Sequence, residues 1–171
     1  NWMQSAIRQW LNSAATTGLW TPKNNYDRPQ SYPTAGFLNG IDADLLACIG
    51  KVRLRTGLNP VDNAGTFGYS DNEELIFLPS RTEMGLGNSV TNIYETPVAA
   101  NGTAKTTTMP LFTDNASRIK YLGMTARYWW LRSPYPGATS AYTAYYVHTD
   151  GSLYSITALN GYGAVPACVI Y

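Results

Sequence analysis

The sequence predicts an α+β fold, in which two helices pack on a small antiparallel sheet and long ordered loops connect the elements. Three observations lead to this prediction. Apolar residues recur at helical spacing in residues 2–15, apolar and polar residues alternate in the C-terminal third, and Asp150-Gly151 separates two alternating runs. Strands joined by so short a turn are antiparallel neighbours, so the sheet is expected at the C-terminal end.

Length and composition predict one folded domain spanning residues 1–171. Such a chain is long enough to bury a core without metals or disulfides. Charged residues make up 13% of the chain against about 25% in an average domain, and the net charge is only +1. No window reaches the ~18 apolar residues of a membrane span. We therefore expect a soluble domain that binds no nucleic acid and does not insert into a membrane. Since Asn1 stands where an initiator Met would, we expect it to be excised from a longer chain.

The first helix is predicted over residues 2–15, because apolar residues recur there every three or four positions. Asn1 and Gln4 have the spacing of a capping box, although Asn stands where Ser or Thr is usual. Gly18 is the expected stop signal.

A second, shorter helix is predicted over residues 42–49, where Leu45 and Ile49 share one face and Gly50 follows as a stop. The segment before it, residues 20–40, is rich in Pro, Gly and Asn. This composition predicts an irregular but ordered loop.

Two strands are predicted in the middle of the chain. Residues 51–56 alternate, with Val52 and Leu54 on one face, and residues 74–79 form a continuous apolar run that is typical of a buried strand. Residues 82–120 show little periodicity and are rich in Thr, Asn and Gly. So long an irregular segment in a compact domain is usually functional, or it is a long loop that packs against the rest of the domain.

The last third predicts an antiparallel sheet. Its strands are expected over residues 127–134, 143–149, 152–157 and 164–171, and the second and third form the hairpin.

Two cysteines, Cys48 and Cys168, lie too far apart in the sequence for a CxxC metal or redox pair. Either they are buried free thiols, or one disulfide ties the middle of the chain to its last strand. We favour free thiols, because free Cys is among the most buried residue types.

The residues for metal or acid–base catalysis are sparse. His148 is the only histidine, so a two-His zinc or three-His iron site is impossible within the chain. His148 and Asp150 flank a turn and no G-x-S-x-G elbow is present, so an exposed strand histidine is favoured over a Ser-His-Asp site. Asp71, Glu73 and Glu74 lack the pattern of a calcium loop. We predict no metal site and no cofactor.

Tyrosines are concentrated near the C-terminal end, interleaved with Ser, Thr, Ala and Gly. Tyr supplies stiff contact area while Ser, Gly and Asn adapt their hydrogen bonds, as in antibody-type binding loops. Alternate tyrosines could equally do no more than cover a sheet. Of Tyr145 and Tyr146, strand alternation sends only one outward, and the sequence leaves open which.

The C-terminal motifs resemble a family of unknown function found in gut bacteria and their phages. Its members read W-L-R-S-P, then D-G-S, then Y-G-V-R-P-A; this chain has WWLRSP at residues 129–134, DGS at 150–152 and YGAVPA at 162–167. The resemblance extends over nearly the whole chain through residues 7–13, 36–38, 76–83 and 112–119.

That family looks like a branch of the C-type lectin fold, related to formylglycine-generating enzymes and to the variable proteins of diversity-generating retroelements. In the variable proteins a reverse transcriptase rewrites a C-terminal segment, so ligand-facing side chains vary on a constant framework. The resemblance implies a framework of Trp129, Trp130, Leu131, Arg132, Gly151, Gly163 and Pro166. It implies ligand-binding display positions at Tyr135, Thr139, Ser140, Tyr142, Thr143, Tyr145, Tyr146, His148, Tyr154, Ser155, Thr157, Leu159, Asn160 and Tyr162.

The chain departs from this pattern in three ways. Val165 replaces the family's Arg, so we expect Arg132 to find its partner elsewhere. The enzymatic relatives need a closely spaced cysteine pair or a histidine iron site, and neither occurs. The E-P-N, Q-P-D and W-N-D motifs of calcium-dependent sugar-binding lectins are also missing.

The expected function is therefore a non-enzymatic ligand- or receptor-binding module, the variable or receptor-binding domain of a phage or prophage structural protein. Its expected partners are a bacterial cell-surface protein or glycan, further copies of itself, or other phage subunits, on the virion or bacterial surface. One alternative is an assembly domain whose Tyr-rich face packs permanently on a neighbouring subunit. Another is an enzyme for a small or cell-wall substrate with Glu83, Asp114 or His148 in its site.

Overall fold

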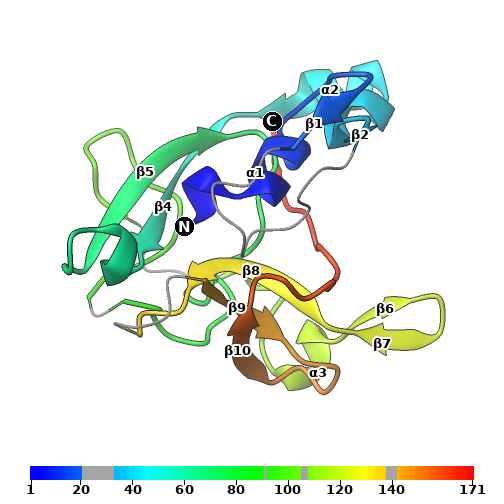
Figure 1. Cartoon of the computed structure of the whole chain (residues 1–171). Coiled ribbons are helices and arrows are strands. Elements are labelled where there is room, and N and C mark those ends of the chain that lie inside the picture. The colour runs from blue at the N-terminus through cyan, green and yellow to red at the C-terminus, as the bar shows by residue number, and fades with distance from the viewer. Residues whose placement is uncertain (21–32, 91, 105–107, 138–141) are drawn as a thin grey trace.

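The chain has an α+β architecture of short helices and small antiparallel sheets, as predicted (Figure 1). The structure, a computed structural model, describes residues 1–20, 33–90, 92–104, 108–137 and 142–171. Most of the loop predicted over residues 20–40 therefore lies outside the described residues. Within them, no helix has the length and apolar character needed to cross a bilayer.

The N-terminal helix is interrupted at Ser5. A 3-10 turn, η1 (Trp2–Gln4), is followed by α1 (Ala6–Leu11), so the continuous helix predicted over residues 2–15 is wrong in extent. The backbone of Ser5 is extended, and its Oγ accepts a hydrogen bond from the backbone N–H of Arg8 at 3.3 Å. A serine that caps a helix in this way starts a new helix rather than continuing the previous turn.

The capping box predicted at Asn1 and Gln4 does not form. The Asn1 side chain makes no cap hydrogen bond to η1. Its Oδ1 instead accepts a hydrogen bond from the backbone N–H of Asn59 at 2.9 Å, which ties the chain start to a distant segment.

The second predicted helix is present as α2 (Ala43–Cys48). Asp42 caps it, because its carboxylate accepts hydrogen bonds from the N–H groups of Asp44 and Leu45. Leu45 is exposed, so the predicted apolar face is only partly used. Three shorter helices are η2 (Phe37–Gly40), η3 (Pro60–Asp62) and α3 (Asn115–Arg118).

The described strands pair antiparallel in four two-stranded sheets and one three-stranded sheet. The two-stranded pairs are β1 (Gly18–Leu19) with β2 (Pro33–Thr34), β3 (Ile49–Gly50) with β11 (Val169–Ile170), β4 (Val52–Leu58) with β5 (Gly68–Glu74), and β6 (Lys120–Leu122) with β7 (Thr125–Arg127). The three-stranded sheet has the order β10 (Leu153–Thr157), β9 (Thr143–Val147), β8 (Trp129–Pro134). The prediction of one small sheet is thus wrong, although the C-terminal hairpin and its third strand are present.

Of the strand predicted over residues 74–79, only Glu74 lies in a strand, as the last residue of β5, and the mostly buried residues 75–79 follow it outside any strand. Leu75 and Ile76 donate their backbone N–H groups to the side-chain oxygen of Asn12, and Phe77 forms a single antiparallel bridge with Ala167. The segment threads through the interior, and a side-chain amide replaces the strand partner that a ladder would supply. The final strand predicted over residues 164–171 is likewise reduced to two residues, β11.

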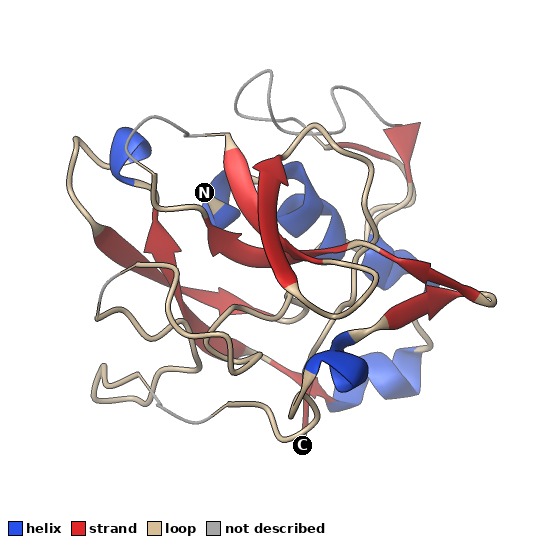
Figure 2. Ribbon diagram, turned by 90° about the horizontal axis from the view of Figure 1, so that it is seen from below, coloured by secondary structure: helices blue, strands red, loops and turns tan. Residues whose placement is uncertain are grey.

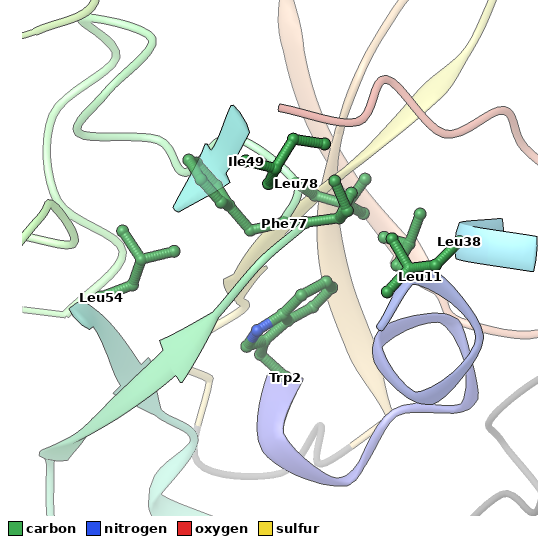
Figure 3. Close-up of a cluster of buried hydrophobic side chains, with 8 residues drawn as sticks. Trp2, Leu11, Leu38, Ile49, Leu54, Phe77 and Leu78 are labelled. Atoms are coloured by element: carbon green, nitrogen blue, oxygen red, sulfur yellow. The ribbon is translucent and has the colours of Figure 1, made fainter. Parts of the chain in front are cut away.

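The hydrophobic core consists of two clusters. The first joins the N-terminal helices to β4 and to the apolar run, with Trp2, Leu11, Leu54 and Phe77 buried in it (Figure 3). The second lies between β8, β9 and the irregular middle of the chain. It contains Met84, Phe112, Trp129, Leu131 and Val147.

The cysteines are both free, as favoured, but both are exposed rather than buried. Strand β11 pairs with β3 in a register that places Ile170 opposite Ile49, and the N–H of Tyr171 donates to the carbonyl of Cys48. If this register continues, Cys48 lies opposite Tyr171, three residues along the strand from Cys168. A disulfide would need their Cα atoms within about 7 Å, which this offset forbids.

A buried polar network joins the middle of the chain to β8. The Arg132 guanidinium bonds both carboxylate oxygens of Glu83, at 2.5 and 2.8 Å, and the carbonyls of Leu78 and Glu95. Arg132 thus has its expected alternative partner. Val165, in the place of the family's Arg, packs against the second core cluster.

Candidate functional site

The exposed side of the three-stranded sheet carries a row of aromatic rings. The register places Trp130 opposite Tyr146, and Tyr146 opposite Tyr154, so the three side chains cross the sheet on one side. The ring of Tyr146 meets Trp130 edge-on at a centroid distance of 6.1 Å and stacks on Tyr154 at 6.1 Å. Aromatic pairs at these separations attract each other beyond the area they bury.

Three further rings complete the surface. Tyr128 lies within 5 Å, centroid to centroid, of both His148 and Tyr162. Tyr162 also contacts Tyr146 at 4.8 Å and Trp130 at 5.0 Å. We call this surface the aromatic face; it comprises Tyr128, Trp130, Tyr146, His148, Tyr154 and Tyr162.

The aromatic face has a buried centre and an exposed margin. Tyr146 is only 8% exposed, whereas Tyr128 is 37% and Tyr154 is 52% exposed. Burial, followed by the neighbouring Tyr162, raises the pKa of Tyr146. The margin therefore exposes ring surface to solvent, and the outer rings pack against the buried ring of Tyr146.

Backbone contacts hold Tyr162 against the sheet. The N–H of Gly163 donates to the carbonyl of Tyr128 at 2.9 Å, and the N–H of Trp130 donates to the carbonyl of Gly163 at 3.0 Å. These bonds attach a loop that is remote in sequence to the edge of β8.

The opposite side of β9 faces the interior. Tyr145 is half-buried; its ring lies under the guanidinium of Arg81 at 4.3 Å and contacts Tyr135 at 5.7 Å. Burial raises the pKa of Tyr145 as well. Of the two neighbouring tyrosines, Tyr146 therefore belongs to the aromatic face, and Tyr145 packs at the margin of the second core cluster.

The predicted display positions divide between these two sides. Tyr146, His148, Tyr154 and Tyr162 meet on the aromatic face, whereas Ser155 pairs with Tyr145 in register and shares its side of the sheet. Thr143 and Thr157 pair in register on the same side as Tyr145, and Tyr135 contacts Tyr145. Tyr142 precedes β9, and Leu159 and Asn160 lie in the turn after β10. Thr139 and Ser140 lie outside the described residues.

The predicted framework positions also differ in their surroundings. Trp129, Leu131 and Arg132 are buried, whereas Trp130 is half-buried and belongs to the aromatic face. Gly151 is buried with φ +80°, and a Cβ there would lie 1.8 Å from the carbonyl oxygen of Asn115. Gly163 acts through the backbone bonds described above, and Pro166 is exposed.

Sequence reasoning missed Tyr128 as a member of the aromatic face. Tyr128 and Trp130 are two residues apart, and so they project from the same side of an extended chain. This alternation is the sequence signal that could have placed Tyr128 beside Trp130.

The three residues considered for catalysis have structural partners. Glu83 is paired with Arg132, and Asp114 caps α3 by accepting a hydrogen bond from the N–H of Ser117 at 2.8 Å. His148 Nδ1 lies 3.1 Å from the Asp150 carboxylate, whose same oxygen accepts from the Ser152 hydroxyl. In a Ser-His-Asp triad the histidine stands between the other two, so this order cannot activate the serine.

The described residues hold no cluster of three or more His, Cys, Asp or Glu side chains that could bind a metal ion.

A groove of about 590 Å³ adjoins the aromatic face. One wall is the β6–β7 hairpin, with Lys120, Tyr121, Leu122 and Arg127, and the other wall is the segment 161–165. Tyr128 and Tyr162 belong to both the groove and the aromatic face. We call it the hairpin groove. Its volume is in the range of ordinary ligand sites.

Comparison with known proteins gives a family without a described activity. No curated protein and no solved structure matches the chain. The family described as "Domain of unknown function (DUF6273)" matches residues 1–171, the whole of the chain. The chain therefore belongs to the DUF6273 family.

Proposed function

We propose that this chain is a non-enzymatic binding module whose aromatic face contacts a partner. The observation that carries the proposal is the arrangement of exposed Tyr128 and Tyr154 around the buried ring of Tyr146. Contiguous aromatic surface on a soluble protein marks interaction sites more often than isolated exposed rings do. Tyr and Trp dominate binding hot spots because they bury a large area at a small entropic cost.

The surroundings of the acidic residues support binding rather than catalysis. Glu83 is neutralised by Arg132, the Glu95 carboxylate accepts hydrogen bonds from Ser89 and Ser133, and Asp114 caps α3. An acid–base catalyst needs a carboxylate that reaches substrate and holds a perturbed pKa in a cleft. These three carboxylates therefore bond to groups of the protein itself.

The setting we propose is the receptor-binding domain of a phage or prophage structural protein with a C-type-lectin-like fold, diversified in the manner of retroelement variable proteins. This part of the proposal is supported by the resemblance of the WWLRSP, DGS and YGAVPA motifs. The partner would be a protein or glycan of a bacterial surface. Repetition of a weak site on a particle would raise its avidity, since a second contact becomes intramolecular.

The test compares two exposed tyrosines. Fluorescently labelled protein is applied to a panel of intact gut-bacterial cells and to a glycan array, as wild type, Tyr154→Ala and Tyr94→Ala. Tyr94 is 43% exposed and is not part of the aromatic face, so it is the matched control. We expect Tyr154→Ala to weaken binding about tenfold, the effect of a hot-spot side chain, with an unchanged Tm.

Equal losses from both substitutions, or no bound cell or glycan, would refute the proposal. Size-exclusion chromatography tests the alternative assembly domain: an obligate oligomer that Tyr154→Ala dissociates would indicate permanent packing of the aromatic face against a neighbouring subunit.

A further inference from the structure

The β6–β7 hairpin presents apolar side chains to solvent. It projects from the body of the chain in both views (Figures 1 and 2). Leu122 is 72% and Met124 is 99% exposed, and Tyr121 beside them is also exposed. A hairpin that only closed a loop would gain little from these residues, because they leave most of their surface in solvent.

The hairpin groove and the hairpin turn beside it carry residue types that are enriched at protein interfaces. Tyr121, Tyr128, Tyr162 and Arg127 line the groove, and Met124 lies in the turn. Lys120 is the exception, because Lys is depleted at such interfaces. Exposed Leu122 and Met124 have no counterpart to bury on a glycan, which presents hydroxyl groups rather than apolar side chains. A polypeptide can supply apolar side chains that pack against them.

The charges of the groove are of one sign. Lys120 stands directly opposite Arg127 in the hairpin register, and like charges in that relation are destabilising. Among the described residues neither forms an ion pair with a carboxylate. The Lys120 ammonium lies 5.1 Å from the Phe112 ring centroid and donates to the carbonyl of Ser117 at 2.9 Å, which uses one of its three donors.

The surrounding sequence contains almost no compensating negative charge. From residue 115 to residue 171, Asp150 is the single acidic side chain, and it is held by His148 and Ser152. Both walls of the groove come from this part of the chain. An anionic group entering between Lys120 and Arg127 would therefore relieve their repulsion, and this relief would act only in the bound state.

We propose that the hairpin groove receives an acidic polypeptide segment of a partner protein. A carboxylate of that segment lies between Lys120 and Arg127, and an apolar side chain packs against Tyr121 and Leu122. The inference rests on the proposed function, because Tyr128 and Tyr162 belong to both surfaces. It narrows the partner from a protein or glycan to an acidic protein.

The test is selection from a random peptide library against four immobilised proteins. These are the wild type, Arg127→Glu, the double variant Lys120→Glu/Arg127→Glu, and Lys51→Glu. Lys51 is exposed and lies outside the groove, so its substitution changes the net charge as Arg127→Glu does and serves as the matched control. Thermal melting of all four proteins establishes that they are folded.

We expect wild type and Lys51→Glu to enrich Asp and Glu about fivefold over the unselected library. Arg127→Glu should abolish that preference, and the double variant should enrich Lys and Arg instead, since specificity follows charge complementarity. Absence of enriched peptides, or the same acidic preference in all four proteins, would overturn the inference.

The two proposals fail in different ways when Tyr154→Ala is also used in the peptide selection and the charge reversals are also used in the cell and glycan assays. Glycan or cell binding that depends on Tyr154 but is unaffected by the charge reversals would leave the proposed function intact and overturn the acidic segment. Acidic peptides whose selection depends on Arg127 but not on Tyr154 would support the groove and remove the aromatic face from the binding site.

Discussion

Arg132 and Glu83 form a bidentate ion pair in the interior, with both side chains withdrawn from solvent. The residues are 49 positions apart in the sequence, so the pair joins β8 to the irregular middle of the chain. Glu83→Gln leaves the Arg132 charge buried without its counter-ion. We expect this change to lower the free energy of unfolding by about 3–5 kcal/mol, measured by denaturant titration.

The control for this prediction is the exposed pair of Lys51 and Glu73, whose atoms are 3.9 Å apart. Lys51→Gln should change the free energy of unfolding by less than about 1 kcal/mol, because solvent screens exposed pairs. Equal effects at the two sites would contradict the structural role assigned to Glu83.

The two neighbouring tryptophans and Tyr154 should differ in how much they contribute to stability. Trp129 is 1% exposed in the second core cluster, so Trp129→Ala should cost about 3–5 kcal/mol of unfolding free energy. Trp130→Ala should cost less, since its ring is half-buried, and Tyr154→Ala should stay within about 0.5 kcal/mol. Thermal and chemical denaturation of the three variants give the order; a loss from Tyr154→Ala as large as that from Trp129→Ala would refute it.

Gly151 should tolerate no side chain. Its φ of +80° is unfavourable for other residues, and an added Cβ would collide with the carbonyl of Asn115. We expect Gly151→Ala to cost at least about 1–3 kcal/mol, the scale of such backbone strain, as measured by a lower Tm. At Gly161 no described heavy atom lies within 4 Å of an added Cβ, so Gly161→Ala should leave the Tm nearly unchanged. A tolerated Gly151→Ala would show that the contact with Asn115 is wrong.

The turn after β9 should show a defined pH dependence. The Ser152 hydroxyl, followed by its backbone N–H, lowers the pKa of Asp150, and His148 adds a smaller effect. A lowered pKa stabilises the fold above the unfolded pKa of about 4, and this contribution is lost as the pH falls through the folded value. Ser152→Ala should move the Asp150 pKa back toward its ordinary value in an NMR titration. Ser155→Ala, in the adjoining strand, should not; a shift of similar size there would discount the hydrogen bond to Ser152.

The elements predicted well are those whose signals are local. The helix capped by Asp42 and the hairpin at Asp150-Gly151 need only a few adjacent residues, because capping and tight turns are satisfied within one or two turns of chain. The strands of the C-terminal sheet follow from alternation for the same reason.

The elements predicted poorly depend on distant partners. β5 (Gly68–Glu74) consists largely of polar residues and shows no apolar alternation, and its pairing with β4 defines it as a strand. Residues 75–79 form no strand, because the backbone N–H groups of Leu75 and Ile76 donate to the side chain of Asn12, more than 60 residues away. Ser5 divides the N-terminal helix even though the apolar spacing continues through it.

The sequence by itself determined the α+β class, the concentration of tyrosines near the C-terminal end and the scarcity of negative charge there. Only the tertiary structure decided that Tyr146 and not Tyr145 joins the aromatic face, since a period of two does not say which side of a strand is covered. It also decided that Glu83 neutralises Arg132 and that Lys120 and Arg127 face one groove. Each of these three relationships joins segments that are distant in the sequence or depends on what covers a strand. The packing of the whole chain determines which segments come into contact.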